Sequence, residues 1–344
     1  MRIFCWLGVL AVVATLFAGC GGSSDAETAS KGPSRPEGAA QATREELQSP
    51  DIFVSLDGRV GAENVGVLIA KERGYFTDLG FKVGVGSPVR PRRPVGYVSN
   101  RTVDFALSQQ PQVVLAKEKR APVIAVGSLL RQPTLSFIWL PGSHIHSIAD
   151  LRGKTIGVPG IPYEERFLQL LLARAGLSRR DVHTKIVGYD LVRTLESGRA
   201  DAIFGGSSNL EGAVLARRGL KPVIVPVRRL GIPDYDELVV IVRSRRVARN
   251  PRLVRKFMAA VARGTAAAIA DPEAAVRVIE ESDEKGYDLS HEDIKAEVEA
   301  TLPLLSRNTY MRRARVRHLV NWMQEQGFIH RPLPVSELTA SFGK

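Results

Sequence analysis

Cysteine is nearly absent from this chain of 344 residues, which contains two. Both Cys5 and Cys20 lie near the N-terminus, so the remainder of the chain has none. A disulfide framework and a cysteine-based zinc site are therefore excluded for the folded part. The sequence also lacks a Gly-x-Ser-x-Gly elbow and a nucleotide-binding glycine loop. These absences argue against several classes of enzyme.

The first residues have the features of an export signal. Arg2 supplies a positive charge, and an apolar stretch runs from Ile3 to Ala18. Leu16-Phe17-Ala18-Gly19-Cys20 resembles the lipobox of bacterial lipoproteins, in which the cysteine is lipidated and becomes the new N-terminus, although Phe17 replaces the usual Leu. The alternative is an uncleaved membrane anchor, since about 20 apolar residues span a bilayer. We expect a signal peptide over residues 1–19, because its removal leaves Cys20 as the one cysteine of the mature chain.

Residues 20–49 are poor in bulky apolar side chains and rich in Gly, Ser, Ala and Pro. Such a composition buries too little surface to fold, so this segment is predicted to be a flexible tether. The remaining residues suffice for one large or two medium domains.

The net charge of +12 and the isoelectric point near 9.9 raise the question of nucleic acid as a partner. We expect none, because an exported protein seldom meets nucleic acid and no aromatic residues interleave with the arginine clusters. A basic surface beside an anionic membrane is the simpler interpretation.

Short β-branched runs alternate with helical segments throughout the body, which is typical of α/β layering. The predicted strands are residues 52–56, 82–85, 103–108, 123–128, 135–140, 155–158, 185–188, 202–205, 222–227 and 237–243. After Asn250 the pattern becomes mostly helical, and this C-terminal segment is expected to support one lobe.

An internal repeat divides the body into two similar parts. The segment that begins at Val95 resembles the one that begins at Val192: each has a short helix, an Asp that opens a buried strand, a small polar loop, a helix and a Pro-Val-Ile strand. Two related α/β units predict two similar lobes. Chance similarity between generic α/β units is the alternative.

Four further motifs resemble those of the substrate-binding proteins of ABC importers for thiamine pyrimidine precursors. They are Lys71-Glu72-Arg73-Gly74-Tyr75-Phe76, Asp150-Leu151-Arg152-Gly153-Lys154, Gly205-Gly206 with Asn209 and Glu211, and Gly231-Ile232-Pro233-Asp234-Tyr235. The first two are shared with sulfonate- and nitrate-binding relatives, whereas the third is narrower. The resemblance covers roughly residues 50 to 335.

The resemblance implies an α/β protein with the two-lobed type II periplasmic-binding-protein fold, in which each lobe is a mixed sheet flanked by helices. Two extended crossings are expected near Leu140 and Leu238. Lobe I would then hold residues 50–140 and 238–344, including the helical C-terminal segment, and lobe II residues 141–237.

Ligands of open α/β sheets bind beyond the carboxyl ends of the strands. Loops rich in Gly or small polar residues occur there, among them Gly205 and Gly206. Glu211 is the first candidate, because a carboxylate can accept two N–H donors of an aminopyrimidine ring, and the resemblance implies a Glu in this role. The alternative is that Glu211 is a carboxylate in the first turn of a helix, a position that the helix dipole favours. Asn209 is a candidate both for ligand contact and for capping that helix.

Aromatic and amide side chains complete the candidate site. Tyr163 and Tyr235 are expected to face each other across the cleft and to sandwich a flat heterocycle, although each could simply be a packing residue. The other candidates offer hydrogen-bond donors and acceptors near strand ends or helix starts; they are Asn64, Gln109, Gln110, Glu164 and Asp57, the last two being the weaker.

Together these features predict a binding protein and no enzyme, with no cofactor and no metal. The expected ligand is a thiamine pyrimidine precursor such as hydroxymethyl- or formylaminomethyl-pyrimidine; riboflavin and then a sulfonate such as taurine are the alternatives. The fungal pyrimidine-precursor synthases share the implied fold, but they resemble a suicide enzyme with a cysteine-rich iron motif that this body lacks. The expected partners are an ABC permease and ATPase, for a monomer anchored by lipid to the outer face of the cytoplasmic membrane.

Overall fold

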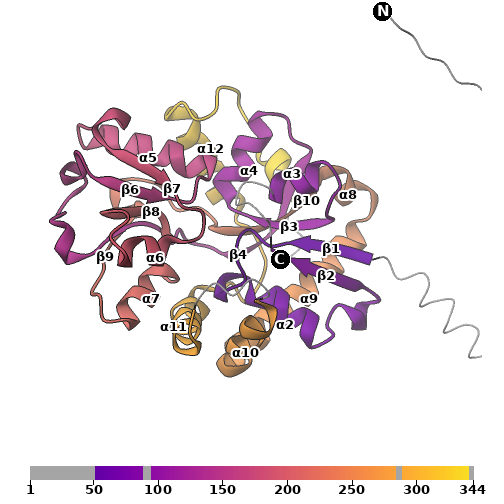
Figure 1. The fold of residues 1–344 in the computed structure, drawn as a ribbon. Coiled ribbons are helices and arrows are strands. Elements are labelled where there is room, and N and C mark those ends of the chain that lie inside the picture. The colour runs from indigo at the N-terminus through magenta and orange to yellow at the C-terminus, as the bar shows by residue number, and fades with distance from the viewer. Residues whose placement is uncertain (1–50, 88–93, 284–288, 341–344) are drawn as a thin grey trace, which may run out of the picture. The chain divides into compact units, whose positions relative to one another are not determined.

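Ten strands form two separate sheets in the part of the chain that the computed structural model describes, which is residues 51–87, 94–283 and 289–340 (Figure 1). Each predicted strand is found, with ends shifted by at most about two residues. The predicted signal peptide, the lipidation of Cys20 and the tether lie outside the described residues. Residues 49–344 make up one compact unit.

The sheet of lobe I has five strands in the order β2-β1-β3-β10-β4. Strands β1, β2 and β3 run parallel, and β10 runs antiparallel between β3 and β4. Their bounds are β1 (Asp51–Ser55), β2 (Lys82–Gly86), β3 (Phe105–Ser108), β4 (Val123–Leu130) and β10 (Leu238–Arg243). Helices cover both faces of this sheet, so β3, β4 and β10 are buried almost throughout and their sequences are runs of Val, Ile and Leu.

The sheet of lobe II repeats this arrangement, in the order β7-β6-β8-β5-β9. Here β5 is the antiparallel strand and lies between β8 and β9, as β10 lies between β3 and β4. The bounds are β5 (Leu135–Trp139), β6 (Thr155–Val158), β7 (His183–Ile186), β8 (Ala202–Ser207) and β9 (Val223–Pro226). The two copies of the predicted repeat thus fall one in each lobe.

The first crossing between the lobes lies earlier than expected. Because β5 pairs with β8 and β9, the chain passes from lobe I to lobe II at residues 131–134, and the placement near Leu140 assigned β5 to the wrong sheet. The second crossing occupies residues 231–237, next to the expected Leu238. All residues of β5 are buried, so its sequence does not indicate which sheet it joins.

Helices pack on both sheets, and three of the C-terminal helices begin at a side-chain cap. For example, Asn250 and Asp271 each accept a hydrogen bond from the backbone N–H three residues on. The helices are α2 (Val65–Glu72), α3 (Pro94–Ser99), α4 (Gln110–Glu118), α5 (Pro162–Arg174), α6 (Leu191–Glu196), α7 (Glu211–Arg217), α8 (Ser244–Arg249), α9 (Pro251–Ala270), α10 (Pro272–Ser282), α11 (His291–Thr301), α12 (Arg313–Glu325) and α13 (Val335–Leu338).

Two glycines allow α2 and α9 to pack closely. A Cβ atom on Gly264 would overlap the carbonyl oxygen of Gly66 and lie 2.8 Å from the backbone nitrogen of Ala70. A Cβ atom on Gly66 would in turn overlap the side chain of Thr265. The close approach fixes α2, and with it the short 3-10 helix η1 (Ala62–Asn64) that precedes α2 at the cleft.

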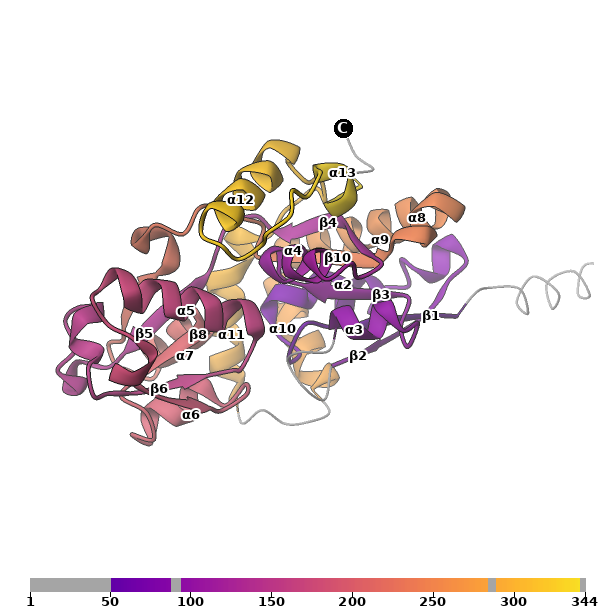
Figure 2. The same ribbon diagram turned by 90° about the horizontal axis from the view of Figure 1, so that it is seen from above.

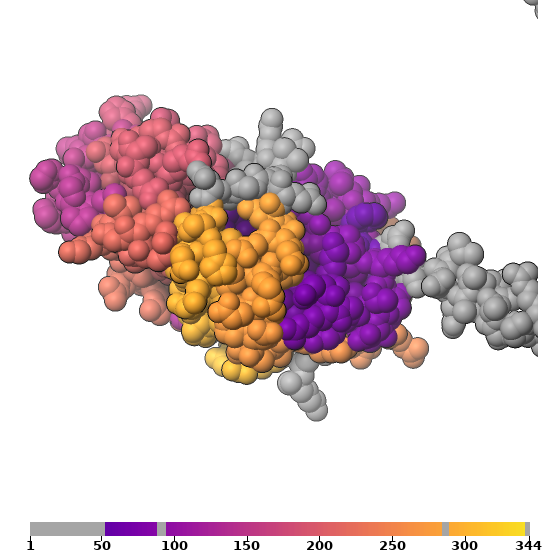
Figure 3. Space-filling model, turned by 60° about the horizontal axis from the view of Figure 1, so that its bottom comes forward, coloured from indigo at the N-terminus to yellow at the C-terminus, as the bar shows by residue number. Residues whose placement is uncertain are grey.

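The C-terminal helices contact both lobes, whereas the sequence assigned them to lobe I alone. Helix α11 packs on α10 and also on α7 of lobe II, and Figure 3 shows the orange helices between the two lobes. Helix α12 lies beside α5 of lobe II (Figure 2). The rings of Trp322 and Phe328 each lie 5.6 Å from that of Phe167 on α5. These helices therefore connect the lobes in addition to the two crossings.

Candidate functional site

A cavity of about 80 Å³ lies between the lobes, at the carboxyl ends of β1 and β3 on one side and of β6 and β8 on the other. This is where ligands of α/β sheets bind. Seven of the residues predicted from the sequence line it: Asp57, Asn64, Gln109, Tyr163, Glu164, Gly205 and Glu211. Their roles in binding remain predictions.

Lobe I contributes a loop held by its own side chains. Asp57 follows β1, and Gln109 at the start of α4 donates from Nε2 to Asp57 Oδ2 at 3.0 Å. Asn64 closes the loop, because its Nδ2 donates to the carbonyl of Arg59 at 3.0 Å and its Oδ1 accepts from the backbone N–H of Gly61 at 3.2 Å. The amide of Asn64 is thus engaged by the loop itself, and Asp57 and Gln109 form a connected pair in the wall.

Lobe II contributes Glu164, in the first turn of α5, where Pro162 begins the helix. Glu164 is 5% exposed, and within the described residues its Oε2 has no hydrogen-bond partner. Gly205 makes room for this carboxyl: its φ of 103° suits glycine, and a Cβ atom there would lie 2.5 Å from Glu164 Oε2. A buried carboxyl oxygen without a partner, in the wall of a cavity, is poised to bind a ligand.

The position of Glu211 is compatible with both roles that the sequence left open. It is the first residue of α7, and its Oε2 accepts a hydrogen bond from the backbone N–H of Ser207 at 2.7 Å. This hydrogen bond closes the turn that precedes the helix. It also lines the cavity and is 8% exposed. One carboxylate oxygen of Glu211 is thus already hydrogen-bonded within the protein, so Glu164 is structurally the better candidate for hydrogen bonding to a ligand.

Four predicted residues lie outside the cavity wall. Gln110 fixes the second crossing, because its Oε1 accepts from the backbone N–H of Asp236 at 2.8 Å. Gly206 pairs with Ser136 inside the sheet. Asn209 connects the lobes, donating to Glu63 Oε1 at 3.1 Å and to Thr301 Oγ1 at 2.8 Å. None of these three contributes a group to the cavity.

Tyr235 is the fourth, and it does not form the expected sandwich with Tyr163. It is fully buried in the second crossing, where its ring packs against Phe167, which also contacts Tyr163 edge-on at 5.4 Å. The two tyrosines therefore belong to one aromatic cluster on the same side of the cavity. Burial raises the pKa of both phenols well above 10.0, so they are neutral.

The sequence did not single out four residues that line the cavity: Arg59, Glu63, Tyr189 and Glu237. Glu237 lies in the second crossing, and its Oε2 accepts from the backbone N–H groups of Thr134 at 2.8 Å and Leu135 at 3.3 Å in the first crossing. One side chain thus touches both crossings and the cavity. A charged residue directly before the apolar strand β10 was the signal available in the sequence.

Carboxyl groups dominate the electrostatics of the cavity. Burial raises the pKa of Asp57 to about 6 and that of Glu237 to about 7. Burial raises the pKa of Glu63 well above 4.5, and the nearby charge of Asp57 adds to this shift. Burial and the charge of Glu237 do the same for the pKa of Glu164. The raised pKa values favour the protonated form of these carboxyl groups, which offers an O–H donor as well as an acceptor.

Among the described residues, Arg59 is the one cation in the cavity wall, and its charge is already balanced. Its guanidinium pairs with Glu297 of α11, whose side chain is fully buried. An anionic ligand would therefore meet buried carboxyl groups and no unpaired cation in the wall. The site favours a neutral or cationic ligand that carries N–H donors.

Tyr189 closes the cavity from lobe II. Its hydroxyl donates to the carbonyl of Asp57 in lobe I at 3.0 Å, and its ring packs on Gly58, where a Cβ atom would lie 3.1 Å from Cε1. Glycine at position 58 thus permits the close approach of this ring. The contact holds the two lobes together over the site.

We expect Tyr189→Phe to accelerate ligand dissociation about fivefold, because the ring stays in place while one hydrogen bond between the lobes is lost. Stopped-flow measurement of the dissociation rate checks this. Tyr97→Phe, which removes a hydroxyl outside the cleft, is the matched control and should leave the rate unchanged. An equal effect of the two substitutions would contradict the closing role of Tyr189.

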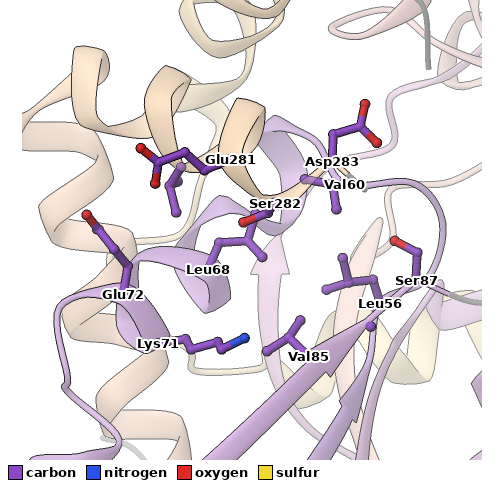
Figure 4. A pocket seen from close by; sticks show the side chains of 12 residues that line it. Leu56, Val60, Leu68, Lys71, Glu72, Val85, Ser87, Glu281, Ser282 and Asp283 are labelled. Atoms are coloured by element: carbon purple, nitrogen blue, oxygen red, sulfur yellow. The ribbon is translucent and has the colours of Figure 1, made fainter. Parts of the chain in front are cut away.

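A larger cavity of about 460 Å³ lies in lobe I beside α2 and α10 (Figure 4). Aliphatic side chains such as Leu56, Leu68 and Val85 line it, with Lys71 and Glu281 among its charged residues. It contains no residue of lobe II and none of the predicted site residues. The smaller cavity, which both lobes build from converging polar groups, is therefore the candidate site.

Metal ligands and membrane-spanning helices were sought throughout the described part of the chain. Within residues 51–87, 94–283 and 289–340, no group of three or more His, Cys, Asp or Glu side chains is arranged to hold a metal ion. No helix in these ranges is both long and apolar enough to cross a membrane.

Two sheets of identical strand order, joined by two crossings around a polar cavity, define a protein of the periplasmic-binding-protein fold. The alkanesulfonate-binding protein of Xanthomonas axonopodis pv. citri has this fold, with a TM-score of 0.66 and 15% identity over 85% of this chain and 98% of its own. The predicted fold class is thereby confirmed. The chain belongs to the NMT1/THI5-like family, whose model matches residues 62–275.

Characterised relatives of the chain include binding proteins and enzymes. A formylaminopyrimidine-binding protein of Halalkalibacterium halodurans is 34% identical over 70% of this chain and 73% of its own. A riboflavin-binding protein of Chloroflexus aurantiacus is 28% identical over 78% and 75%. A 4-amino-5-hydroxymethyl-2-methylpyrimidine phosphate synthase of Saccharomyces cerevisiae is 25% identical over 66% and 69%. The predicted family resemblance is confirmed, and the formylaminopyrimidine-binding protein is more similar to this chain than this synthase is.

Proposed function

We propose that this protein is the solute-binding component of an ABC importer and captures a thiamine pyrimidine precursor, such as a hydroxymethyl- or formylaminomethyl-aminopyrimidine, in the cavity between its lobes. The observation that carries the proposal is the buried carboxyl of Glu164, whose Oε2 has no hydrogen-bond partner among the described residues, in a wall whose carboxyl groups have raised pKa values. The similarity to a formylaminopyrimidine-binding protein supports it.

The chemistry of a protonated carboxyl matches an aminopyrimidine edge. Such a group donates through its O–H and accepts through its carbonyl oxygen. A 4-aminopyrimidine presents the complementary pair, a ring nitrogen that accepts and an adjacent amino group that donates. Because burial raises the pKa of Glu164 well above 4.5, its carboxyl keeps the required proton to a higher pH than an ordinary carboxyl does.

The size and charge of the cavity bear on the alternative ligands. Pockets for drug-sized ligands typically have about 300–1,000 Å³, whereas this cavity has about 80 Å³. A single small ring suits it better than the three fused rings of riboflavin. A sulfonate would lie among the carboxyl groups of Asp57, Glu63 and Glu164 without an unpaired cation in the wall, which disfavours it.

Capture would proceed by closure of the lobes over the ligand. The crossings at residues 131–134 and 231–237 serve as the hinge in this proposal, and Glu237 hydrogen-bonds across them while lining the cavity. A ligand that contacts Glu237 would therefore favour the closed hinge, because it binds the closed form better than the open one. The permease would recognise that closed form.

The chain acts as a binding protein and not as an enzyme in this proposal, with the synthases among its relatives as the alternative. It would be exported, lose residues 1–19 and carry a lipid on Cys20, as a monomer on the outer face of the cytoplasmic membrane. Its partners there would be the permease and the ATPase.

Isothermal titration calorimetry and thermal unfolding of residues 49–344 test the proposed function. Aminopyrimidine precursors should bind and raise the melting temperature, with about 2.7 kcal/mol of stabilisation at a hundredfold excess over Kd. Taurine should not bind, and riboflavin should bind more weakly. Mass spectrometry should recover the pyrimidine unchanged. Stabilisation by taurine alone, or turnover of the pyrimidine, would overturn the proposal.

A further inference from the structure

Five arginines gather at one end of lobe I, around a cavity of about 330 Å³. They come from the loop before β3, the end of β10 and helix α8, and we call them the basic edge: Arg101, Arg243, Arg245, Arg246 and Arg249. One carboxylate, Asp104, lies among them and is paired with Arg246. The basic edge therefore has a net charge of about +4 where these side chains meet.

The basic edge lies at the end of the sheet opposite to the ligand cavity. Strands β1 and β3 run parallel, and their carboxyl ends lead to Asp57 and Gln109 in the cavity wall. Their amino ends meet the carboxyl end of the antiparallel β10, where Arg243 and α8 follow. Figures 1 and 2 show α8 and the amino end of β1 at the same end of lobe I. If the basic edge binds to a surface, the ligand cavity therefore faces away from that surface.

Three of the five arginines have no protein partner. Arg101, Arg245 and Arg249 are exposed, and no described residue forms a hydrogen bond or ion pair with their side chains. Arg243 donates to the carbonyl of Ser99, and the guanidinium of Arg246 lies 5.9 Å from the centre of the Phe105 ring. Like charges held this close repel one another, so an anionic partner would stabilise them.

An exposed aromatic side chain lies next to the basic edge. Phe53 on β1 is 55% exposed and lines a shallow, mostly apolar depression of about 320 Å³ together with Val85 and Tyr97. Val103 lines both this depression and the arginine cavity, so the two adjoin. Basic side chains beside an exposed aromatic ring are typical of surfaces that bind at a membrane interface.

We propose that the basic edge and Phe53 form a second membrane contact, which binds the anionic headgroups of the lipid surface. The described body begins at Asp51, the first residue of β1, and so at the same end of the sheet. The segment expected to carry the lipid enters the body there. The proposal rests on the extracytoplasmic anchoring proposed above, and it sets the ligand cavity away from the membrane. Phe53 favours lipid over a free phosphate, which gains nothing from an aromatic ring.

Vesicle sedimentation with residues 49–344, which contain both sheets and lack Cys20, tests the contact without the lipid anchor. The body should bind phosphatidylglycerol-rich vesicles and not phosphatidylcholine vesicles at low salt, and 0.5 M NaCl should release it. The triple variant Arg101→Gln, Arg245→Gln, Arg249→Gln should bind at least tenfold more weakly, because each exposed arginine near an anionic surface contributes severalfold.

The matched control removes the same charge from lobe II, with Arg179→Gln, Arg180→Gln and Arg228→Gln, all exposed. This control should keep most of the vesicle affinity. Equal losses in the two triple variants, or no binding to anionic vesicles at all, would overturn the proposal.

Tryptophan fluorescence locates the contact independently. With Phe53→Trp, brominated lipids in anionic vesicles should quench the new tryptophan, whereas with Ile186→Trp, at a 64% exposed position on lobe II, they should not. Quenching at both positions alike would contradict an oriented contact. Calorimetry of the arginine variant with aminopyrimidine separates the membrane contact from the proposed function. If the cavity does not bind the pyrimidine, vesicle binding should remain. If the membrane contact is wrong, pyrimidine binding should remain.

Discussion

Glu164→Ala is expected to weaken the binding of a 4-aminopyrimidine about a hundredfold, whereas Glu164→Gln should retain most of the affinity. Alanine removes a buried group that would make two hydrogen bonds to the ligand, and such losses cost roughly 1.5–3 kcal/mol when one partner is charged or shares a proton. Glutamine keeps one donor and one acceptor at the same place. Calorimetry on the three proteins measures the difference.

The pH dependence of affinity distinguishes a protonated carboxyl from a carboxylate. The complex would hold one proton between Glu164 and the ring nitrogen, and burial raises the pKa of Glu164 well above 4.5 in the free protein. Below that raised pKa the free protein already carries the proton. Above it, binding requires proton uptake, so affinity should fall by about tenfold per pH unit. The glutamine variant has no such proton, and the contribution of this residue to the pH profile should disappear.

Glu165 provides the matched control for Glu164. It is the next residue of α5, is also acidic and does not line the cavity. Glu165→Ala should therefore leave ligand affinity within about twofold. If Glu164→Ala and Glu165→Ala bound the pyrimidine equally well, or if Glu164→Gln were as weak as Glu164→Ala, Glu164 would not read the ligand as proposed.

The sequence predicts the strands well because most of them are short apolar runs bounded by Gly, Pro or polar residues. It misplaces β5, since a strand whose residues are all buried has no face that indicates its sheet. The internal repeat indicates the sheet to which β5 belongs. It places β3 and β4 in one lobe and β8 and β9 in the other, and β10 lies between the former pair as β5 lies between the latter. Antiparallel partners that arrive from distant sequence are not visible in local periodicity.

Candidate site residues at strand ends and helix starts were predictable, because the sheet brings those positions together. Asp57, Gln109 and Glu164 lie in the cavity wall for this reason. Tyr189 and Glu237 were not predictable in this way. The former reaches the cavity from a loop after the edge strand β7, and the latter from a crossing, where contacts depend on how the lobes close.

Asp293 joins α11 to lobe II, and its charge is buried with only 1% of the side chain exposed. Arg217 of α7 and Arg218, the residue that follows α7, each pair with Asp293 at 2.6 Å, and Arg218 also binds Glu196 of α6. Asp293 in addition accepts hydrogen bonds from Ser290 in a capping box at the start of α11. One carboxylate thus ties a C-terminal helix to two helices of lobe II.

Asp293→Asn is expected to lower the free energy of unfolding by about 3 kcal/mol, because breaking a buried ion pair leaves the partner charges poorly compensated. Asparagine has the same shape and can still accept hydrogen bonds at the cap, so the loss reports the charge. Urea unfolding at pH 7 measures it. The ligand should also bind more weakly, since a weaker link between α11 and lobe II destabilises the closed form.

Asp150→Asn is the matched control, because Asp150 occupies the same place in a capping box with Ser147 but is exposed and pairs with no arginine among the described residues. It should cost about 1 kcal/mol or less.

Burial opposes ionisation of Asp293, but hydrogen bonds from Arg218, Ser290 and Arg217 outweigh it and hold its pKa well below 3.8. A depressed pKa stabilises the fold above the ordinary carboxyl pKa, and this stability is lost as pH falls below about 4. The asparagine variant should lack that part of the acid sensitivity. Equal costs for the two substitutions at pH 7 would show that the cap, and not the link between lobes, accounts for the effect of Asp293.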